Sequence, residues 1–132
     1  MEKIVMEATP TTPKIILDPA AGQFDISGKS LPENSFEFYR PILEWMDNYA
    51  VTCSGTSTLS FRLEYFNTSS TSHFLKIIKK LEKLHVEGKS ATVLWYHDPD
   101  DDDMREAGED FKLLVRMPIE IIAAESPSED TH

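Results

Sequence analysis

The sequence has a single cysteine and no long apolar run, and each shortage narrows the class of protein. Cys53 has no second cysteine to pair with in this chain of 132 residues, so a reducing compartment is the simplest interpretation. No stretch approaches the roughly 20 consecutive apolar residues of a membrane-spanning helix. The N-terminus also lacks the apolar segment of a signal peptide. We therefore expect a soluble cytoplasmic protein.

Basic residues are also in short supply. The chain has 13 lysines and arginines against 23 acids, for a formal net charge of −10. Such a charge repels phosphate backbones and anionic lipids, so neither nucleic acid nor a membrane is an expected partner. The one basic cluster, LKIIKKLEKLH at 75–85, has helical spacing, and its simplest interpretation is a solvated helix face.

Motifs of several enzyme classes are missing. The sequence has no GxxxxGK[ST] or GxGxxG for nucleotides, no GxSxG nucleophile elbow and no HExxH or paired Cys/His spacing for zinc. An acidic run resembles a calcium loop, but its sixth position, which demands glycine, is Asp103. Acids in the first turn of a helix explain that run without a metal. We expect no cofactor and no metal; the acids at loop positions 1, 3, 5 and 12 are Asp98, Asp100, Asp102 and Glu109.

Hydrophobic residues make up 40% of the chain, enough for the core of one domain over 1–124. Residues 1–13 look irregular, and the polar end, 125–132, is expected to be disordered. Alternating patterns predict strands at 14–18, around Phe24 and Ile26, and at 58–66, 90–97 and 119–123. Helical periodicity predicts helices over about 34–50, 71–87 and 103–115. The order β-β-α-β-α-β-α-β predicts an α/β fold: a small mixed sheet of about five strands, with helices mainly on one face.

The first predicted helix has a clear start and one discordant residue. Asn34 is a suitable N-cap, with Glu37 three residues later to complete a capping box. Pro41 removes one backbone donor and should kink or restart this helix. Its predicted buried stripe comprises Phe36, Tyr39, Ile42, Leu43, Met46 and Ala50. In the strand at 58–66, the predicted buried face comprises Leu59, Phe61, Leu63 and Tyr65.

The stretch FNTSST at 66–71 places four hydroxyls where a strand gives way to a helix. Ser69 or Ser70 is expected to cap that helix, because an N-cap oxygen accepts a backbone N–H. One cap needs only one hydroxyl, however, and the N-terminus of a helix also stabilises a phosphate. The pattern therefore leaves two interpretations open, a purely structural corner and a phosphorylation site.

Two other kinds of function remain open at this point. A small enzyme would use His97 and Asp98, at the end of a strand, with a hydroxyl from the corner. A constitutive protein-interaction module would use the hydroxyls only as caps. Substitution at His97 and at the corner distinguishes the three, because only the enzyme requires both.

Three segments together resemble one protein family. PENSFEFY before the first helix, LEYFNTSST at the end of a strand and WYHD after the second helix are similar to the SiaC-like family of bacterial regulatory phosphoproteins. The similarity extends over about residues 8–124, and PENS and NTSS at this separation are specific together.

The resemblance implies a STAS-like fold, of the anti-sigma-factor-antagonist type, and a partner-switching function without catalysis. It implies that a protein kinase phosphorylates Thr68, the threonine of NTSS, and that a PPM-type phosphatase removes the phosphate. Ser69 and Ser70 are the fallback acceptors. The unmodified form is then expected to bind an effector, in known members a diguanylate cyclase of c-di-GMP signalling. The expected partner surface is the corner itself: Phe66, Asn67, Thr68, Ser69 and Ser70.

Overall fold

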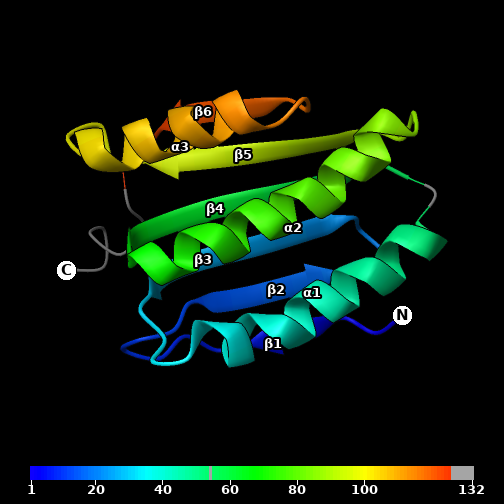
Figure 1. The fold of residues 1–132 in the computed structure, drawn as a ribbon, viewed down its shortest axis with the longest axis horizontal. Coiled ribbons are helices and arrows are strands. Elements are labelled where there is room, and N and C mark those ends of the chain that lie inside the picture. Colours follow the sequence, from blue (N-terminus) through cyan, green and yellow to red (C-terminus); the bar gives the residue numbers. More distant parts are fainter. Residues whose placement is uncertain (54, 126–132) are drawn as a thin grey trace.

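The computed structural model describes residues 1–53 and 55–125, in which six strands form one mixed sheet beside three helices (Figure 1). The α/β class and the predicted succession of elements are confirmed. None of the helices in the described residues is long and apolar enough to cross a membrane. In chain order the elements are β1 (Ile4–Met6), β2 (Lys14–Asp18), β3 (Gln23–Ser30), α1 (Ser35–Thr52), β4 (Ser57–Phe66), α2 (Thr68–Val86), β5 (Ala91–His97), α3 (Asp102–Leu114) and β6 (Ile119–Ala123).

Strand β1 corrects the prediction that residues 1–13 are irregular. It pairs antiparallel with β2 and brings the half-buried Ile4 and Met6 against the core. A strand of three residues is too short to show a period of two, which explains why the sequence pattern did not reveal it. At the other end, the predicted disordered tail lies outside the described residues except for Glu125.

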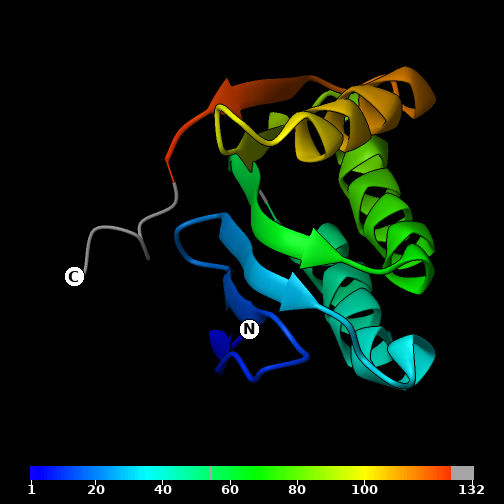
Figure 2. The ribbon, with the colours of Figure 1, turned by 90° about the vertical axis from the view of Figure 1, so that its left-hand side faces the viewer.

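The sheet order follows the chain from β1 to β6, antiparallel up to β3 and parallel from β3 onward. Each parallel connection passes through a helix. Crossovers of one hand that advance in one direction across a sheet place their helices on one face. Figure 2 shows this arrangement, with all three helices on the same side of the sheet, as predicted. It also means that α1, α2 and α3 all begin at the edge where the parallel strands end.

The core lies between the sheet and the helices. Its centre is aromatic: the ring of Phe61 lies 5.2 Å from that of Phe74 and 5.0 Å from that of Trp95. On α3, Gly108 admits the Trp95 ring so closely that a Cβ at this glycine would lie 2.4 Å from the indole Cδ1 atom. The Trp95 indole also donates to the Met104 carbonyl at 2.8 Å, which fixes α3 on β5.

Two residues predicted in the core are exposed. The register of β3 and β4 shifts between Gly28 and Lys29, which turns Tyr65 outward, 57% exposed, and Phe66 inward. An irregularity of this kind reverses the alternation of the residues that follow it. On α1, Phe36 in the first turn is 59% exposed, and the buried stripe begins at Tyr39 and includes Trp45 and Tyr49.

Helix α1 otherwise begins as predicted. The Asn34 side chain accepts the Glu37 N–H at 3.1 Å, which confirms the N-cap. Of the two outcomes predicted at Pro41, a kink or a restart, the restart is wrong, since one helix extends through this proline. Pro41 lies on the exposed side of α1, where a missing N–H donor does not disturb the core.

Candidate functional site

The corner between β4 and α2 lies at the left in Figure 1, where α1 and α2 both begin. Asn67 is the N-cap of α2, and its Oδ1 accepts the Ser70 backbone N–H at 3.1 Å. The prediction that Ser69 or Ser70 caps the helix is therefore wrong. The asparagine is the last residue with extended backbone, so α2 starts at Thr68, three residues before its predicted start. Asn67 thus binds the backbone of the corner, as asparagine does in turns.

The four hydroxyls at this corner lie in different environments. Thr68 is exposed, and no hydrogen bond within residues 1–53 and 55–125 engages its hydroxyl. Ser69 is also exposed, but its Oγ donates to Asn67 Oδ1 at 3.0 Å. Ser70 is completely buried, which puts this fallback acceptor out of reach of a kinase. Thr71 is exposed one turn into the helix. Thr68 and Thr71 are thus the two corner hydroxyls that are exposed and that no hydrogen bond within the described residues engages, and Thr68 is the one at the first position of α2.

Buried hydroxyls form a chain beneath Thr68. Ser30 Oγ, at the end of β3, lies 2.5 Å from the Tyr39 phenol oxygen and 2.7 Å from Ser70 Oγ. Ser70 Oγ in turn lies 2.7 Å from Asn67 Oδ1, which can only accept. Each hydroxyl has one proton, so the chain runs in one direction: Tyr39 donates to Ser30, and Ser30 donates to Ser70. Ser70 then donates to Asn67 Oδ1, or to the Ser30 carbonyl oxygen at 3.1 Å. Burial raises the pKa of Tyr39 to about 12, which keeps this phenol protonated as the first donor.

His73 joins α1 to the same corner. Its ring stacks on Tyr39 with centroids 5.3 Å apart, and its Nε2 lies 3.1 Å from the Ser35 hydroxyl in the first turn of α1. Burial lowers the pKa of His73, with a contribution from the positive charge of Lys76, so the ring is neutral at pH 7. The starts of the two helices are therefore held together by the stacked rings of Tyr39 and His73 and by the hydrogen bond between His73 and Ser35.

These supporting residues gave little signal in the sequence. Ser30 lies 40 positions before Ser70, and no local pattern connects the two. Helical periodicity predicts that Tyr39 is buried, but it does not predict which group its phenol hydroxyl binds. Only the presence of polar tips on apolar faces, as in Tyr39 and His73, indicates that partners must lie opposite them.

Two exposed aromatic side chains flank the corner, Tyr65 from the end of β4 and Phe36 from the first turn of α1. Ser35, the neighbour of Phe36, contacts His73 on α2, so this part of α1 lies beside the corner. Phe66, which was predicted on the partner surface, packs inward on Phe74 at 5.2 Å. The exposed side chains at the end of β4 and at the start of α1 accordingly include two aromatic rings, with the carboxylates of Glu64 and Glu37 exposed beside them.

The start of α2 is also an electrostatic feature. The Thr68 and Ser69 backbone N–H groups have no acceptor within the helix, as in the first turn of any helix. They point toward the helix start, where the dipole favours negative charge. A phosphate on the Thr68 hydroxyl would lie beside these donors.

The enzyme interpretation finds no assembled site. His97 is buried, and its Nδ1 lies 2.8 Å from the Asp98 carbonyl oxygen. Within the part of the chain that the structure describes, no hydrogen bond joins His97 to the corner hydroxyls. In the acidic run, Asp101 caps α3 by accepting the Met104 N–H at 3.0 Å. No three His, Cys, Asp or Glu side chains among residues 1–53 and 55–125 gather as metal ligands.

Comparison with known proteins identifies the family. The model of the SiaC family of regulatory phosphoproteins matches residues 6–124. The chain belongs to the SiaC family. It is a regulatory phosphoprotein and not an enzyme, as the resemblance implied.

Relatives agree over nearly the whole chain. An uncharacterised protein of Pseudomonas aeruginosa strain UCBPP-PA14 is 30% identical over 123 residues, which cover 93% of this chain and 98% of the relative. The structure of SiaC of Pseudomonas aeruginosa superposes with a TM-score of 0.87 at 30% identity, over 94% of this chain and 100% of the other. A chain in the crystal structure of the diguanylate cyclase SiaD in complex with its activator SiaC, from the same organism, gives 0.87 at 30% identity, over 92% and 99% of the two chains.

Proposed function

We propose that Thr68 is the phosphoacceptor of this SiaC-family protein and that its phosphate decides which partner binds. The observation that carries the proposal is the position of Thr68, which is exposed, unengaged within the described residues and the first residue of α2. Ser69 is hydrogen-bonded to Asn67, Ser70 is buried, and Thr71, although exposed and unengaged within the same residues, lies one turn into the helix. A protein kinase adds the phosphate and a PPM-type phosphatase removes it. The protein supplies the substrate hydroxyl and performs no catalysis of its own.

The unmodified corner is the surface that binds the effector. Thr68 follows β4, whose end carries the exposed ring of Tyr65, and α1 begins nearby with the exposed ring of Phe36, a combination that suits docking of an apolar surface with a few hydrogen bonds. The SiaC protein of Pseudomonas aeruginosa is the activator of the diguanylate cyclase SiaD. By analogy, we propose a diguanylate cyclase as the effector of this chain, which places it in c-di-GMP signalling in the cytoplasm.

Phosphorylation opposes this docking through solvation and charge. A phosphate brings a charge of about −1.5 to −2 and a shell of strongly held water into this surface. Burying it against an apolar partner costs several kcal/mol unless that partner supplies cations. Each 1.4 kcal/mol is a factor of ten, so an interface of micromolar Kd is lost. Because the Thr68 hydroxyl takes no part in the hydrogen-bonded chain that ends at Ser70 and Asn67, we expect the core to keep its structure in both forms.

The test measures binding of the purified cyclase partner to Thr68→Ala and Thr68→Glu variants by calorimetry. We expect Thr68→Ala to bind within about threefold of the wild type and Thr68→Glu to bind at least tenfold more weakly. Thr71→Ala and Thr71→Glu, at an exposed hydroxyl one turn into α2, are the matched controls and should leave the affinity unchanged. Equal binding by Thr68→Ala and Thr68→Glu would show that the hydroxyl is only structural.

A further inference from the structure

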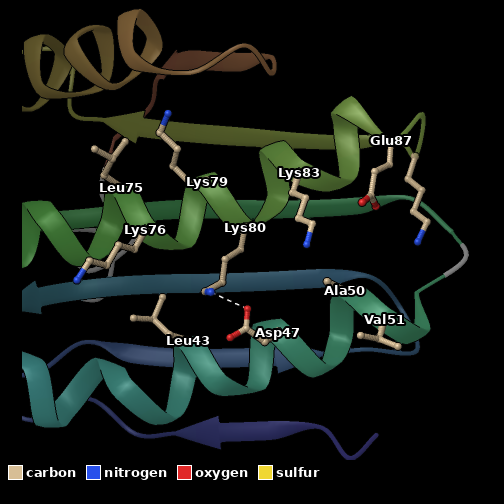
Figure 3. A pocket seen from close by; sticks show the side chains of 11 residues that line it. Leu43, Asp47, Ala50, Val51, Leu75, Lys76, Lys79, Lys80, Lys83 and Glu87 are labelled. Carbon is tan, nitrogen blue, oxygen red and sulfur yellow. Dashed lines mark hydrogen bonds and ion pairs between the residues drawn. The ribbon is translucent and has the colours of Figure 1, made fainter.

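A second surface lies between the outer sides of α1 and α2, away from the Thr68 corner (Figure 3). It is a groove of about 820 Å³ that runs along the two helices. Five of the 13 lysines and arginines of the chain line it, although the protein as a whole carries a charge of −10. The lining lysines are Lys76, Lys79, Lys80, Lys83 and Lys89, with Asp47 and Glu87 as the only acids of the lining.

The groove has apolar walls. Leu43 on α1 and Leu75 on α2 are only half-buried, and Val51, at the end of α1, is 84% exposed. In Figure 3, Leu43 points from α1 toward α2 and Lys83 points from α2 toward α1, whereas Leu75 lies on the side of α2 away from α1. Apolar groups left open between two helices are the side of a layer that a third helix can cover.

Two of the lysines are already used within the fold. Lys80 Nζ lies 2.6 Å from Asp47 Oδ1 and bridges the groove. Lys79 Nζ donates to the Leu114 carbonyl at 3.1 Å, toward α3. Their roles are therefore structural.

Lys76 and Lys83 are different. Both are exposed, and neither forms an ion pair within residues 1–53 and 55–125. They are seven residues apart on α2, which places them on the same side of the helix about 10 Å apart along its axis. They lie before and after Lys80, so one uncompensated positive charge stands on each side of the Lys80–Asp47 bridge.

We propose that this groove binds an acidic amphipathic helix of a partner protein. Leucine-like side chains of that helix fill the apolar space at Leu43, Leu75 and Val51, and two acids about two turns apart pair with Lys76 and Lys83. A small phosphate-bearing ligand fits less well, because it needs cations that converge on one point, whereas these lysines are spread along an apolar wall. The site is independent of phosphorylation at Thr68 and does not require the proposed switch.

A display library tests the proposal. The library contains 18-residue peptides with helical periodicity. Each position of one helical stripe is either Leu or Ser, and each position flanking that stripe is either Glu or Lys. Peptides that bind the immobilised full-length protein are selected. We expect enrichment of Leu in the stripe and of Glu at pairs seven residues apart. Since the whole protein carries a charge of −10, nonspecific attraction selects Lys instead, so the sign of the enriched charge is diagnostic.

Variants locate the binding. The double variant Lys76→Glu, Lys83→Glu should bind the enriched peptide at least tenfold more weakly by fluorescence anisotropy. The control Lys29→Glu, Lys112→Glu, at exposed lysines on β3 and α3, makes the same change of net charge and should bind within about twofold of the wild type. Urea unfolding confirms that each variant is folded. Enrichment of Lys or Ser, or equal weakening in both double variants, would overturn the proposal.

Discussion

Ser70→Ala should destabilise the protein far more than its position at a polar corner suggests. Ser70 is completely buried, and its Oγ contacts Ser30 Oγ and Asn67 Oδ1, each at 2.7 Å. Without it, the Tyr39 and Ser30 hydroxyls have two protons and only each other as acceptors. They can form one bond between them, so one buried O–H remains unsatisfied whichever way they turn.

The size of the effect follows from that count. A lost hydrogen bond together with an unsatisfied buried donor costs about 2 kcal/mol, within a range of about 1–3. For a chain of this length that lowers Tm by about 6–10 °C. Urea unfolding followed by tryptophan fluorescence measures the free energy directly, with an unchanged m-value as the check that only stability has altered.

Two neighbouring variants should lower the free energy of unfolding by less than Ser70→Ala does. Tyr39→Phe leaves Ser30 donating to Ser70, so it removes one hydrogen bond and strands no donor, at a cost of about 1 kcal/mol. Ser69→Ala removes an exposed hydroxyl and should change the free energy of unfolding by less than about 0.5 kcal/mol. If Ser70→Ala is as mild as Ser69→Ala, the directed chain of hydroxyls does not exist.

Three further predictions concern the same corner and its support. Asn67→Ala should cost about 1 kcal/mol by removing the cap of α2, with Asn67→Asp retaining most of the stability, and an equal loss in urea unfolding for both variants would contradict the cap. Burial holds the pKa of His73 below 6.5, so on acidification the unfolded state binds the proton before the folded state does. The free energy of unfolding should therefore fall as the pH drops from 7 through 6.5. His73→Gln should flatten this part of the plot of unfolding free energy against pH, measured by urea unfolding. Gly108→Ala forces a Cβ to 2.4 Å from buried Trp95 and should lower the free energy of unfolding by about 1–3 kcal/mol in the same assay. Gly55→Ala, whose new Cβ would meet no atom of the described residues within 4 Å, should lower it by less than about 0.5 kcal/mol. Similar losses for the two variants would contradict the packing of Gly108 on Trp95.

The regular elements of the fold could be predicted because their signals are local. Alternation in KIILD and in residues 58–63 specified strands with one buried face, and Asn34 marked the start of α1. The errors arose where a partner in space decides the outcome. The register shift opposite Gly28 turned Tyr65 outward, and β1 is held by its pairing with β2 rather than by any pattern of its own.

The position of the candidate site could also be predicted from local patterns, but the burial of its hydroxyls could not. The position of the corner followed from the strand and helix patterns, and the choice of Thr68 came from resemblance to a family. What separates Thr68 from Ser70 is burial, which depends on Ser30 and Tyr39, residues far from both in sequence. The groove between α1 and α2 gave no signal either, because a run of lysines at helical spacing looks the same on a fully solvated face.

The central claim is that Thr68 carries a reversible phosphate. Phosphopeptide mass spectrometry of the protein isolated from its native cells, with and without phosphatase treatment, tests it most directly. The account predicts a phosphate on Thr68 that the phosphatase removes, and none on Ser70. A phosphate on another residue, or an unmodified peptide spanning 66–71 under every growth condition examined, would contradict it.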